Sequence, residues 1–200
     1  MMIRKIVITG GPCGGKTTAM SRIQSAFTAK GYTVLFVPET ATEFISGGVA
    51  PWTCGSNAVY QECQMELQII KEKLFSKAAA SMPAEKILIV CDRGVMDNKV
   101  YMTEEEFASI LRNTGKSEED FLGGYDAVFH LVTTAKGAKE HYTTANNAAR
   151  RENVEEAARL DDSLIKAWAG HPHLRVIDNS TGFEEKMDRL LAEISEFLGE

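Results

Sequence analysis

The residues GGPCGGKTT at positions 10–18 have types and a spacing suited to holding a polyphosphate. Glycines let backbone N–H groups approach a ligand without interference from Cβ atoms, and some can adopt positive φ. The stretch matches the pattern G-x-x-x-x-G-K-[ST], whose lysine reaches the β- and γ-phosphates and whose hydroxyl binds Mg²⁺. It therefore predicts a site for ATP (or GTP) with Mg²⁺. The expected binding residues are Gly10, Gly11, Pro12, Cys13, Gly14, Gly15, Lys16, Thr17 and Thr18.

Three charged residues stand at the ends of apolar runs. Asp92 ends the run ILIVCD, where a carboxylate is expected to hold or orient Mg²⁺ beside Thr17. Arg93 follows it, and a forked guanidinium suits bidentate phosphate contacts. Glu39 follows the run YTVLFVP; it either accepts the proton of an acceptor hydroxyl or caps the next helix. With Lys16, these residues form the expected catalytic group, and either carboxylate could be the general base.

A pair of arginines suggests a lid over this site. If residues 146–168 form a helix, Arg150, Arg151 and Asp161 project onto its apolar side. Charged groups there are costly unless they are paired or bind a ligand. We therefore expect Arg150 and Arg151 to be catalytic residues that close on the transferring phosphoryl group, within a lid at about 136–170, and Asp161 to anchor one of them. The alternative is that both arginines precede the helix and are solvated.

The elements that must position these residues alternate along the chain. Apolar, β-branched runs predict strands over 3–10, 32–39, 86–92, 126–132 and 174–178. Helical patterns cover 16–30, 58–80, 103–122 (two short helices), 150–168 and 183–198. This alternation predicts an α/β domain over residues 1–200, with a parallel sheet covered by helices on both faces. The carboxyl ends of its strands would bring the glycine loop and the strand-end charges together.

The long helix expected over 58–80 has two distinct faces. Its amphipathic, core-facing stripe is expected to contain Val59, Cys63, Ile70, Leu74 and Ala78. A second face carries Gln61, Gln64 and Gln68. Those amides could read the base of an acceptor, although a solvated polar face is the simpler interpretation.

Composition limits the classes of function. Of 200 residues, 44% are hydrophobic and 25% are charged, as in ordinary globular proteins. The net charge of −6 argues against a dedicated nucleic-acid-binding protein. No apolar run approaches the roughly 18 residues of a membrane span, and no signal peptide is evident, so we expect a cytoplasmic protein. The four cysteines lack metal-type spacing and are expected to be reduced.

Several motifs together carry a family resemblance. ITGGPCGGKTT, VPETATE, VCDRGVMD, YDAVFHL and HPHLRVIDN resemble the AAA-type P-loop domain shared by NadR-type ribosylnicotinamide kinases and TRPL-translocation-defect proteins, over roughly residues 3–198. The resemblance implies a three-layer, kinase-like P-loop NTPase fold with a five-stranded parallel sheet in the order 2-3-1-4-5. It also implies ATP or GTP with Mg²⁺ at Gly10 to Thr18, and Asp92 as the Walker B acid. It does not settle the acceptor, of which nicotinamide riboside is one candidate.

Two functions follow from these motifs. The first is a kinase-like phosphotransferase that moves the γ-phosphoryl group to an unidentified small nucleoside-like or other metabolite acceptor. The alternative is a regulatory nucleotide-binding NTPase that acts on a protein partner. A Ras-like switch is disfavoured, because DNKV at 97–100 lacks the aspartate of N-K-x-D and DRGV does not match D-x-x-G.

Overall fold

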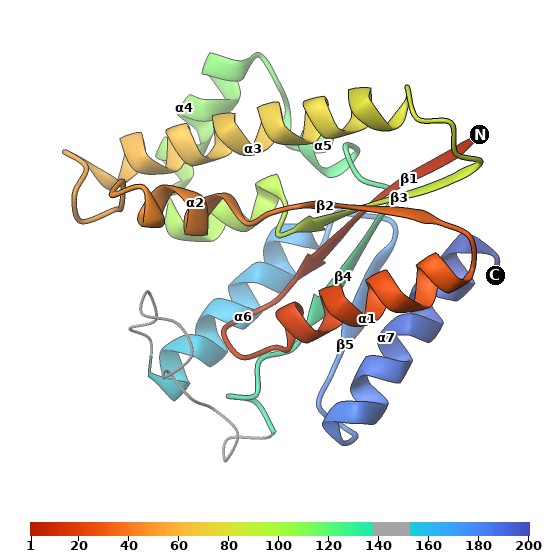
Figure 1. The fold of residues 1–200 in the computed structure, drawn as a ribbon. Helices are drawn as coiled ribbons and strands as arrows, with labels where there is room; N and C mark the ends of the chain where they lie inside the picture. The colour runs from red at the N-terminus through yellow and green to blue at the C-terminus, as the bar shows by residue number, and fades with distance from the viewer. Residues whose placement is uncertain (138–152) are drawn as a thin grey trace.

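The fold is built on one parallel sheet of five strands. The computed structural model describes residues 1–137 and 153–200 (Figure 1). The strand order is β2-β3-β1-β4-β5, which confirms the predicted sheet and its order. The strands are β1 (Met2–Thr9), β2 (Thr33–Val37), β3 (Lys86–Asp92), β4 (Ala127–Leu131) and β5 (Leu174–Ile177).

Helices connect the strands. They are α1 (Lys16–Ala29), α2 (Thr40–Ser46), α3 (Asn57–Ala79), α4 (Glu104–Thr114), α5 (Glu118–Leu122), α6 (Val154–Trp168), α7 (Phe183–Leu198) and the 3₁₀ helix η1 (Val95–Tyr101). The two short helices expected within 103–122 are α4 and α5, and each begins with a capping box. Nothing in the sequence pattern predicted η1.

Helix α6 begins later than the sequence pattern suggested. The side chain of Asn153 accepts a hydrogen bond from the backbone N–H of Glu156, and the carboxylate of Glu156 accepts one from the backbone N–H of Asn153. This capping box starts the helix at Val154, not near residue 150. Arg150 and Arg151, and with them most of the arginine-lid prediction, lie outside the described residues.

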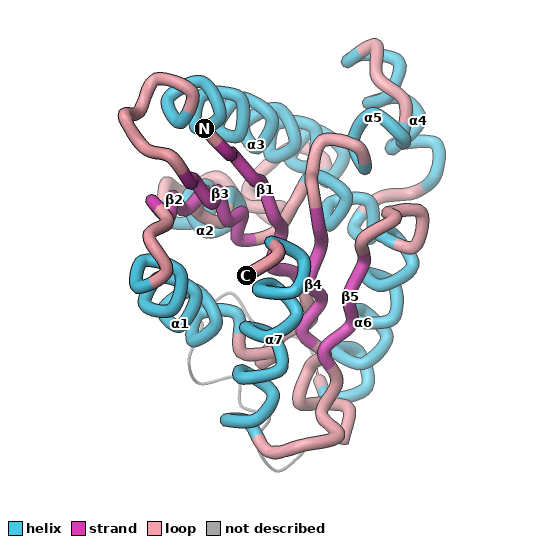
Figure 2. Tube along the Cα trace, turned by 90° about the vertical axis from the view of Figure 1, so that its right-hand side faces the viewer, coloured by secondary structure: helices cyan, strands magenta, loops and turns pink. Residues whose placement is uncertain are grey.

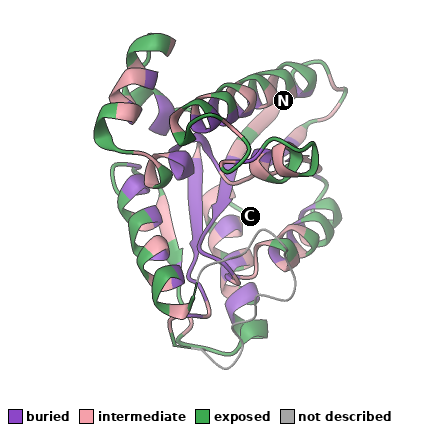
Figure 3. Ribbon diagram, turned by 90° about the vertical axis from the view of Figure 1, so that its left-hand side faces the viewer, coloured by how far each residue is buried: buried purple, intermediate pink, exposed green. Residues whose placement is uncertain are grey.

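The helices cover both faces of the sheet (Figures 1 and 2). Side chains alternate between the faces along each strand. Ile6 and Ile8 pack with Ile23 of α1 and Leu190 of α7, whereas Val7 belongs to a second core that contains residues of α3, α6 and η1. Because both faces are covered, the carboxyl-terminal half of β1, most of β3 and all of β4 are buried and mainly apolar, and Figure 3 shows buried strands at the centre of the fold.

Helix α3 is rotated relative to the sequence-based expectation. Val59, Ile70 and Leu74, predicted to face the core, are 53%, 52% and 57% exposed. The buried face instead contains Tyr60, Gln61, Gln64, Met65, Gln68 and Glu72. Most of its polar groups have partners within the described protein: Glu72, for example, accepts hydrogen bonds from Lys5, Gln68 and Tyr125. Hydrogen bonding makes this burial tolerable, so the interpretation of the glutamine face as solvated is wrong.

Strand register brings the ends of β1, β2, β3 and β4 to one edge of the sheet. Ile8 of β1 is paired with Asp92 of β3, and Thr9 is paired with His130 of β4. Val37 of β2 is paired with Cys91, so the residues after β2 and β3 lie side by side. None of the described helices has the length and hydropathy needed to cross a membrane.

Candidate active site

The glycine loop between β1 and α1 is a tight turn packed against the end of β4. Gly10 and Gly15 have φ of 140° and 96°. A Cβ at Gly10 would lie 2.1 Å from the carbonyl oxygen of Leu131, and one at Gly14 would lie 2.6 Å from it. Both backbone conformation and close packing therefore require glycine. Helix α1 starts directly after this loop without an acidic first turn or a side-chain cap, which leaves its N–H groups available to an anion.

Lys16 curls back over the loop that precedes it. Its Nζ donates to the carbonyl oxygens of Gly10 at 2.9 Å and Gly11 at 3.1 Å. Burial, and then the positive charge of Arg93, lower the pKa of Lys16 to about 8. A lysine in this position gains from a nearby anion, because the anion would stabilise its charged form.

Asp92 ends β3 beside the glycine loop. Its Oδ1 is buried and has no hydrogen-bond partner among the described residues. Burial raises the pKa of Asp92, and the neighbouring Glu39 raises it further. An unpaired buried carboxylate oxygen is costly, and a cation would offset that cost.

These residues fit Mg²⁺ that is shared with phosphates. Mg²⁺ is usually held by one or two carboxylates together with phosphate oxygens and water, so it does not need a full protein cage. Asp92 and Thr17 both line the same cleft. In the described part of the chain, no group of three His, Cys, Asp or Glu side chains forms a separate metal site.

Glu39 and Arg93 form an ion pair across the ends of β2 and β3. The Nε of Arg93 donates to Oε1 of Glu39 at 2.5 Å, and Thr42 donates to Oε2 at 2.6 Å. Burial raises the pKa of Glu39, but Arg93, the Thr42 hydroxyl and Lys16 together outweigh it, and the pKa falls to about 2. Glu39 occupies the N-cap position of α2 without a side-chain capping bond. Its carboxylate therefore accepts from the side chains of Arg93 and Thr42, not from the free backbone N–H groups at the start of α2.

The backbone of Arg93 is unusual. Its φ of 68° is rare for a residue other than glycine. The Nη1 of Arg93 donates to the carbonyl of Gly10 at 3.4 Å and lies 3.5 Å from Asp97. Strained conformations of this kind cluster at functional sites. Here it accompanies a guanidinium that is held against both Glu39 and the glycine loop.

Asp161 of α6 supports the glycine loop from behind. Its Oδ1 accepts from the backbone N–H groups of Gly11 at 3.0 Å and Thr133 at 3.1 Å, and contacts Nε2 of His130 at 3.0 Å. Its Oδ2 accepts from Lys136 at 2.9 Å. Burial raises the pKa of Asp161, but these bonds outweigh it and lower the pKa to about 2. Asp161 was expected to anchor Arg150 or Arg151, which lie outside the described residues, and its described partners belong to the glycine loop and the segment that follows β4, together with His130 of β4.

Lys186 of α7 supports the loop from a second side. This lysine is 2% exposed, and burial lowers its pKa to about 8. Its Nζ donates to the carbonyls of Val132 at 2.6 Å and Gly14 at 3.2 Å, and to Oδ1 of Asn179 at 2.8 Å. One buried amine therefore joins the glycine loop to the ends of β4 and β5. Its place beside the apolar stripe of α7 was the only sequence signal for this role.

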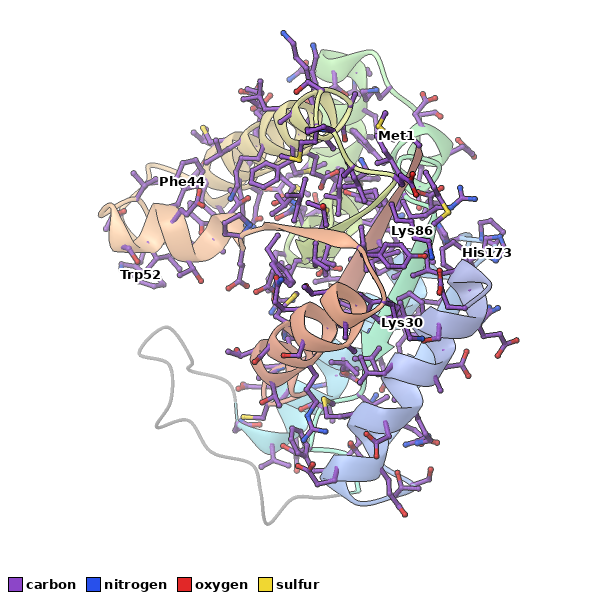
Figure 4. All side chains as sticks on the ribbon, turned by 45° about the vertical axis from the view of Figure 1, so that its right-hand side comes forward. Met1, Lys30, Phe44, Trp52, Lys86 and His173 are labelled. Atoms are coloured by element: carbon purple, nitrogen blue, oxygen red, sulfur yellow. The ribbon has the colours of Figure 1, made fainter. Side chains whose placement is uncertain are left out.

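A cleft of about 1140 Å³ contains all four predicted strand-end and loop residues, Lys16, Glu39, Asp92 and Arg93. At one end it is lined by the glycine loop and by residues 179–183 after β5. At the other end it is lined by residues of α2, α3 and η1 and by Trp52. Figure 4 shows Trp52 at the outer end of the α2 region, away from the sheet.

A parallel sheet in this order, with a glycine loop leading from its central strand into a helix and an aspartate ending the adjacent strand, defines a P-loop NTPase. An AAA domain model matches residues 5–186, and the chain belongs to this family of P-loop nucleotide-binding domains. A search of curated proteins finds no match. The narrower resemblance to NadR-type and TRPL-translocation-defect proteins stays a prediction.

The role of Asp161 can be tested by Asp161→Asn. The pKa of Asp161 is about 2 when folded and ordinarily 3.8, so its ionised form contributes about 2 kcal/mol to folding. This contribution is present above pH 3.8 and is lost as the pH falls toward 2. Urea unfolding at pH 7 should show that loss in the variant, and calorimetry should show about tenfold weaker ATP binding.

The neighbouring Asp162→Asn is the matched control. Asp162 is exposed and binds the same Lys136 Nζ, at 2.6 Å, but does not touch the glycine loop. Its variant should bind ATP and unfold like the wild type. Equal effects of the two substitutions would show that Lys136, not the loop contact, is what matters.

Proposed function

We propose that this protein is a Mg²⁺-dependent phosphotransferase that moves the γ-phosphoryl group of ATP or GTP to a small acceptor. The observation that carries the proposal is the Glu39–Arg93 pair, which lines the cleft between the glycine-loop end and a further space lined by α2 and α3. An NTPase needs room only for water beside the γ-phosphate. The additional space is consistent with a larger acceptor.

The nucleotide would bind first to the glycine loop. Backbone N–H groups at the start of α1 and the ammonium of Lys16 would hold the phosphates, with Lys16 exchanging its bonds to Gly10 and Gly11 for phosphate oxygens. Bound Mg²⁺ would neutralise charge on the β- and γ-phosphates, with Asp92 and Thr17 as its protein ligands.

Glu39 would then orient the acceptor. Its carboxylate would accept a hydrogen bond from the acceptor hydroxyl, whose oxygen bonds to the γ-phosphorus as the bond from that phosphorus to the β–γ bridging oxygen breaks. The hydroxyl proton would be released to solvent water as the new bond forms, and the nucleoside diphosphate would then leave the site. Because the pKa of Glu39 is about 2, it is a weak base and acts mainly by orientation. A loose transition state requires little base strength.

Glu39→Gln should therefore slow transfer by about 100-fold while leaving ATP affinity within twofold. Glu39 stays ionised above about pH 2, so the ratio of wild-type to variant kcat should be constant from pH 5 to 9. Glu43→Gln is the matched control, since Glu43 lies on the same helix but binds Lys71 in an exposed pair. A ratio that falls between pH 7 and 5 would instead assign Glu39 as a titrating base.

A transfer screen tests the function itself. The protein is incubated with [γ-³²P]ATP, Mg²⁺ and panels of nucleosides, nucleotides and other hydroxyl-bearing metabolites, and the products are separated. Label on an acceptor, in excess of a Lys16→Ala blank, is the expected result. Release of labelled phosphate at one rate with every panel would favour the regulatory NTPase and overturn the phosphotransferase.

A further inference from the structure

Gln61 of α3 lines the end of the cleft away from the glycine loop and has a buried amide oxygen without a hydrogen-bond partner among the described residues. The residue is 3% exposed and lines the cleft. Its Nε2 donates to Oδ1 of Asn57 at 3.4 Å, whereas its Oε1 is buried with no hydrogen-bond partner among the described residues. A buried acceptor without a donor is unfavourable in the empty protein and would gain from a ligand that supplies one.

The orientation of this amide is fixed by a chain of hydrogen bonds. The Nδ2 of Asn57 donates to the backbone carbonyl of Tyr101 at 2.8 Å. A carbonyl can only accept, so the nitrogen of Asn57 must face Tyr101 and its oxygen must face Gln61. Gln61 must then donate from its amide nitrogen to Asn57, and its amide oxygen points away from Asn57. The position is therefore set to accept a hydrogen bond.

Gln64 repeats the arrangement one helical turn further on. Its Nε2 donates to Oδ1 of Asn98 at 2.5 Å, and the Nδ2 of Asn98 donates to the carbonyl of Val95 at 3.2 Å. The same reasoning leaves the oxygen of Gln64 as the remaining atom of an amide that lines the cleft. Gln68, by contrast, uses both ends of its amide within the protein. Gln61 and Gln64 thus both use their amide nitrogens within the protein, which leaves their oxygens as the acceptors at this end of the cleft.

The charged and aromatic side chains at this end of the cleft also indicate which class of ligand it can bind. Among the described residues at this end of the cleft, the cation is Arg93, and it is already bound to Glu39. Trp52, which is 54% exposed, also lines the space and is an aromatic side chain of the kind that packs against a flat ring.

We propose that this end of the cleft binds a nucleoside whose base carries an amino group, and that Gln61 is the specificity-determining residue that accepts a hydrogen bond from it. The consequence of binding, phosphorylation of the nucleoside, rests on the proposed function. The recognition itself does not, and it can be measured without turnover.

The test is calorimetric titration in the presence of Mg²⁺ and the β,γ-methylene analogue of ATP, which occupies the nucleotide end. The ligands are two matched pairs: cytidine and its analogue without the 4-amino group, and adenosine and purine riboside. For at least one pair, the wild type should bind the amino nucleoside tenfold or more tightly than its partner. In Gln61→Met this ratio should fall below twofold.

Two further variants keep the test decisive. Gln24→Met makes the same change on the exposed surface of α1 and should behave as wild type. Asn57→Ala removes the residue that fixes the Gln61 amide, which can then rotate and offer its nitrogen. That variant should keep its affinity for the amino nucleoside within a few-fold but lose most of the discrimination. Thermal unfolding midpoints confirm that each variant is folded.

The outcomes separate the inference from the function. Failure of both amino nucleosides to bind, or a preference unchanged in Gln61→Met, overturns the inference, even if the transfer screen finds some other acceptor. Selective binding that is lost in Gln61→Met, but without transfer of label to the bound nucleoside, supports the assignment of Gln61 and overturns the phosphotransferase.

Discussion

Lys16→Ala should reduce turnover of ATP by about 100- to 1000-fold and weaken its binding. The ammonium of Lys16 is held over the glycine loop by the carbonyls of Gly10 and Gly11. In the proposed transfer, its ammonium would donate hydrogen bonds to the phosphate oxygens and stabilise the negative charge that develops on them. Steady-state kinetics give the loss of turnover, and calorimetry gives the loss of affinity.

The pH dependence identifies the group responsible. The pKa of Lys16 is about 8 in the free protein, and bound phosphates would raise it. ATP binding by the wild type should therefore weaken as the pH rises above 8, because binding then requires proton uptake. The alanine variant should lack this decline. Lys77→Ala, on the exposed surface of α3, is the control and should match the wild type at every pH. Normal turnover in Lys16→Ala would contradict the assignment of the loop.

The arrangement of the fold could be predicted because the residue pattern of each segment agrees with its place in the parallel sheet. A strand segment buried on both faces is expected to be largely apolar, and the buried stretches of β1, β3 and β4 are. The glycine loop, Glu39 and Asp92 follow strand ends, so a parallel sheet necessarily brings them to one edge. The strand order itself came from the family resemblance, since alternation of strands and helices fits several orders.

The faces of α3 show where hydrophobic periodicity fails. An apolar stripe normally indicates the buried side of a helix, but Ile70 and Leu74 are exposed. The opposite side is buried because it lines the cleft and contacts η1, an element that the sequence did not predict. Glutamines that appeared to form a solvated face are therefore the residues we assign to recognition. Hydrophobic periodicity identifies the apolar side of a helix, but where a helix lines a polar cleft the buried side can be the polar one.

The supports of the glycine loop depend on tertiary contacts. Asp161 was noticed as a charge on an apolar helix face, but its partners Gly11 and Thr133 are distant in sequence and become neighbours only through the sheet. Lys186 likewise binds Gly14, 172 positions away. Such contacts have no local sequence pattern, so the sequence could place Lys16, Glu39, Asp92 and Arg93 at one cleft but could not identify the contacts that support the glycine loop.

Asp92→Asn should cut turnover by about 100-fold or more but change nucleotide affinity by only a few-fold. Asparagine keeps the shape of the side chain and removes the charge that would hold Mg²⁺. Oδ1 of Asp92 is buried without a described partner, and burial raises the pKa of this carboxyl, so the charge is costly to the empty protein. Its removal should therefore leave the free energy of unfolding at pH 7 unchanged or slightly raised.

If Asp92→Asn lowers turnover but not the free energy of unfolding, the charge of Asp92 serves the site and not the fold. The critical comparison is the gain in ATP affinity that Mg²⁺ gives over ATP in EDTA, measured by calorimetry. It should be clear in the wild type and small in Asp92→Asn. Asp188→Asn is the matched control, because Asp188 is an exposed carboxylate on α7. If turnover and affinity fell equally, or if the gain from Mg²⁺ persisted, Asp92 would not be a metal ligand, and its buried oxygen would need another partner.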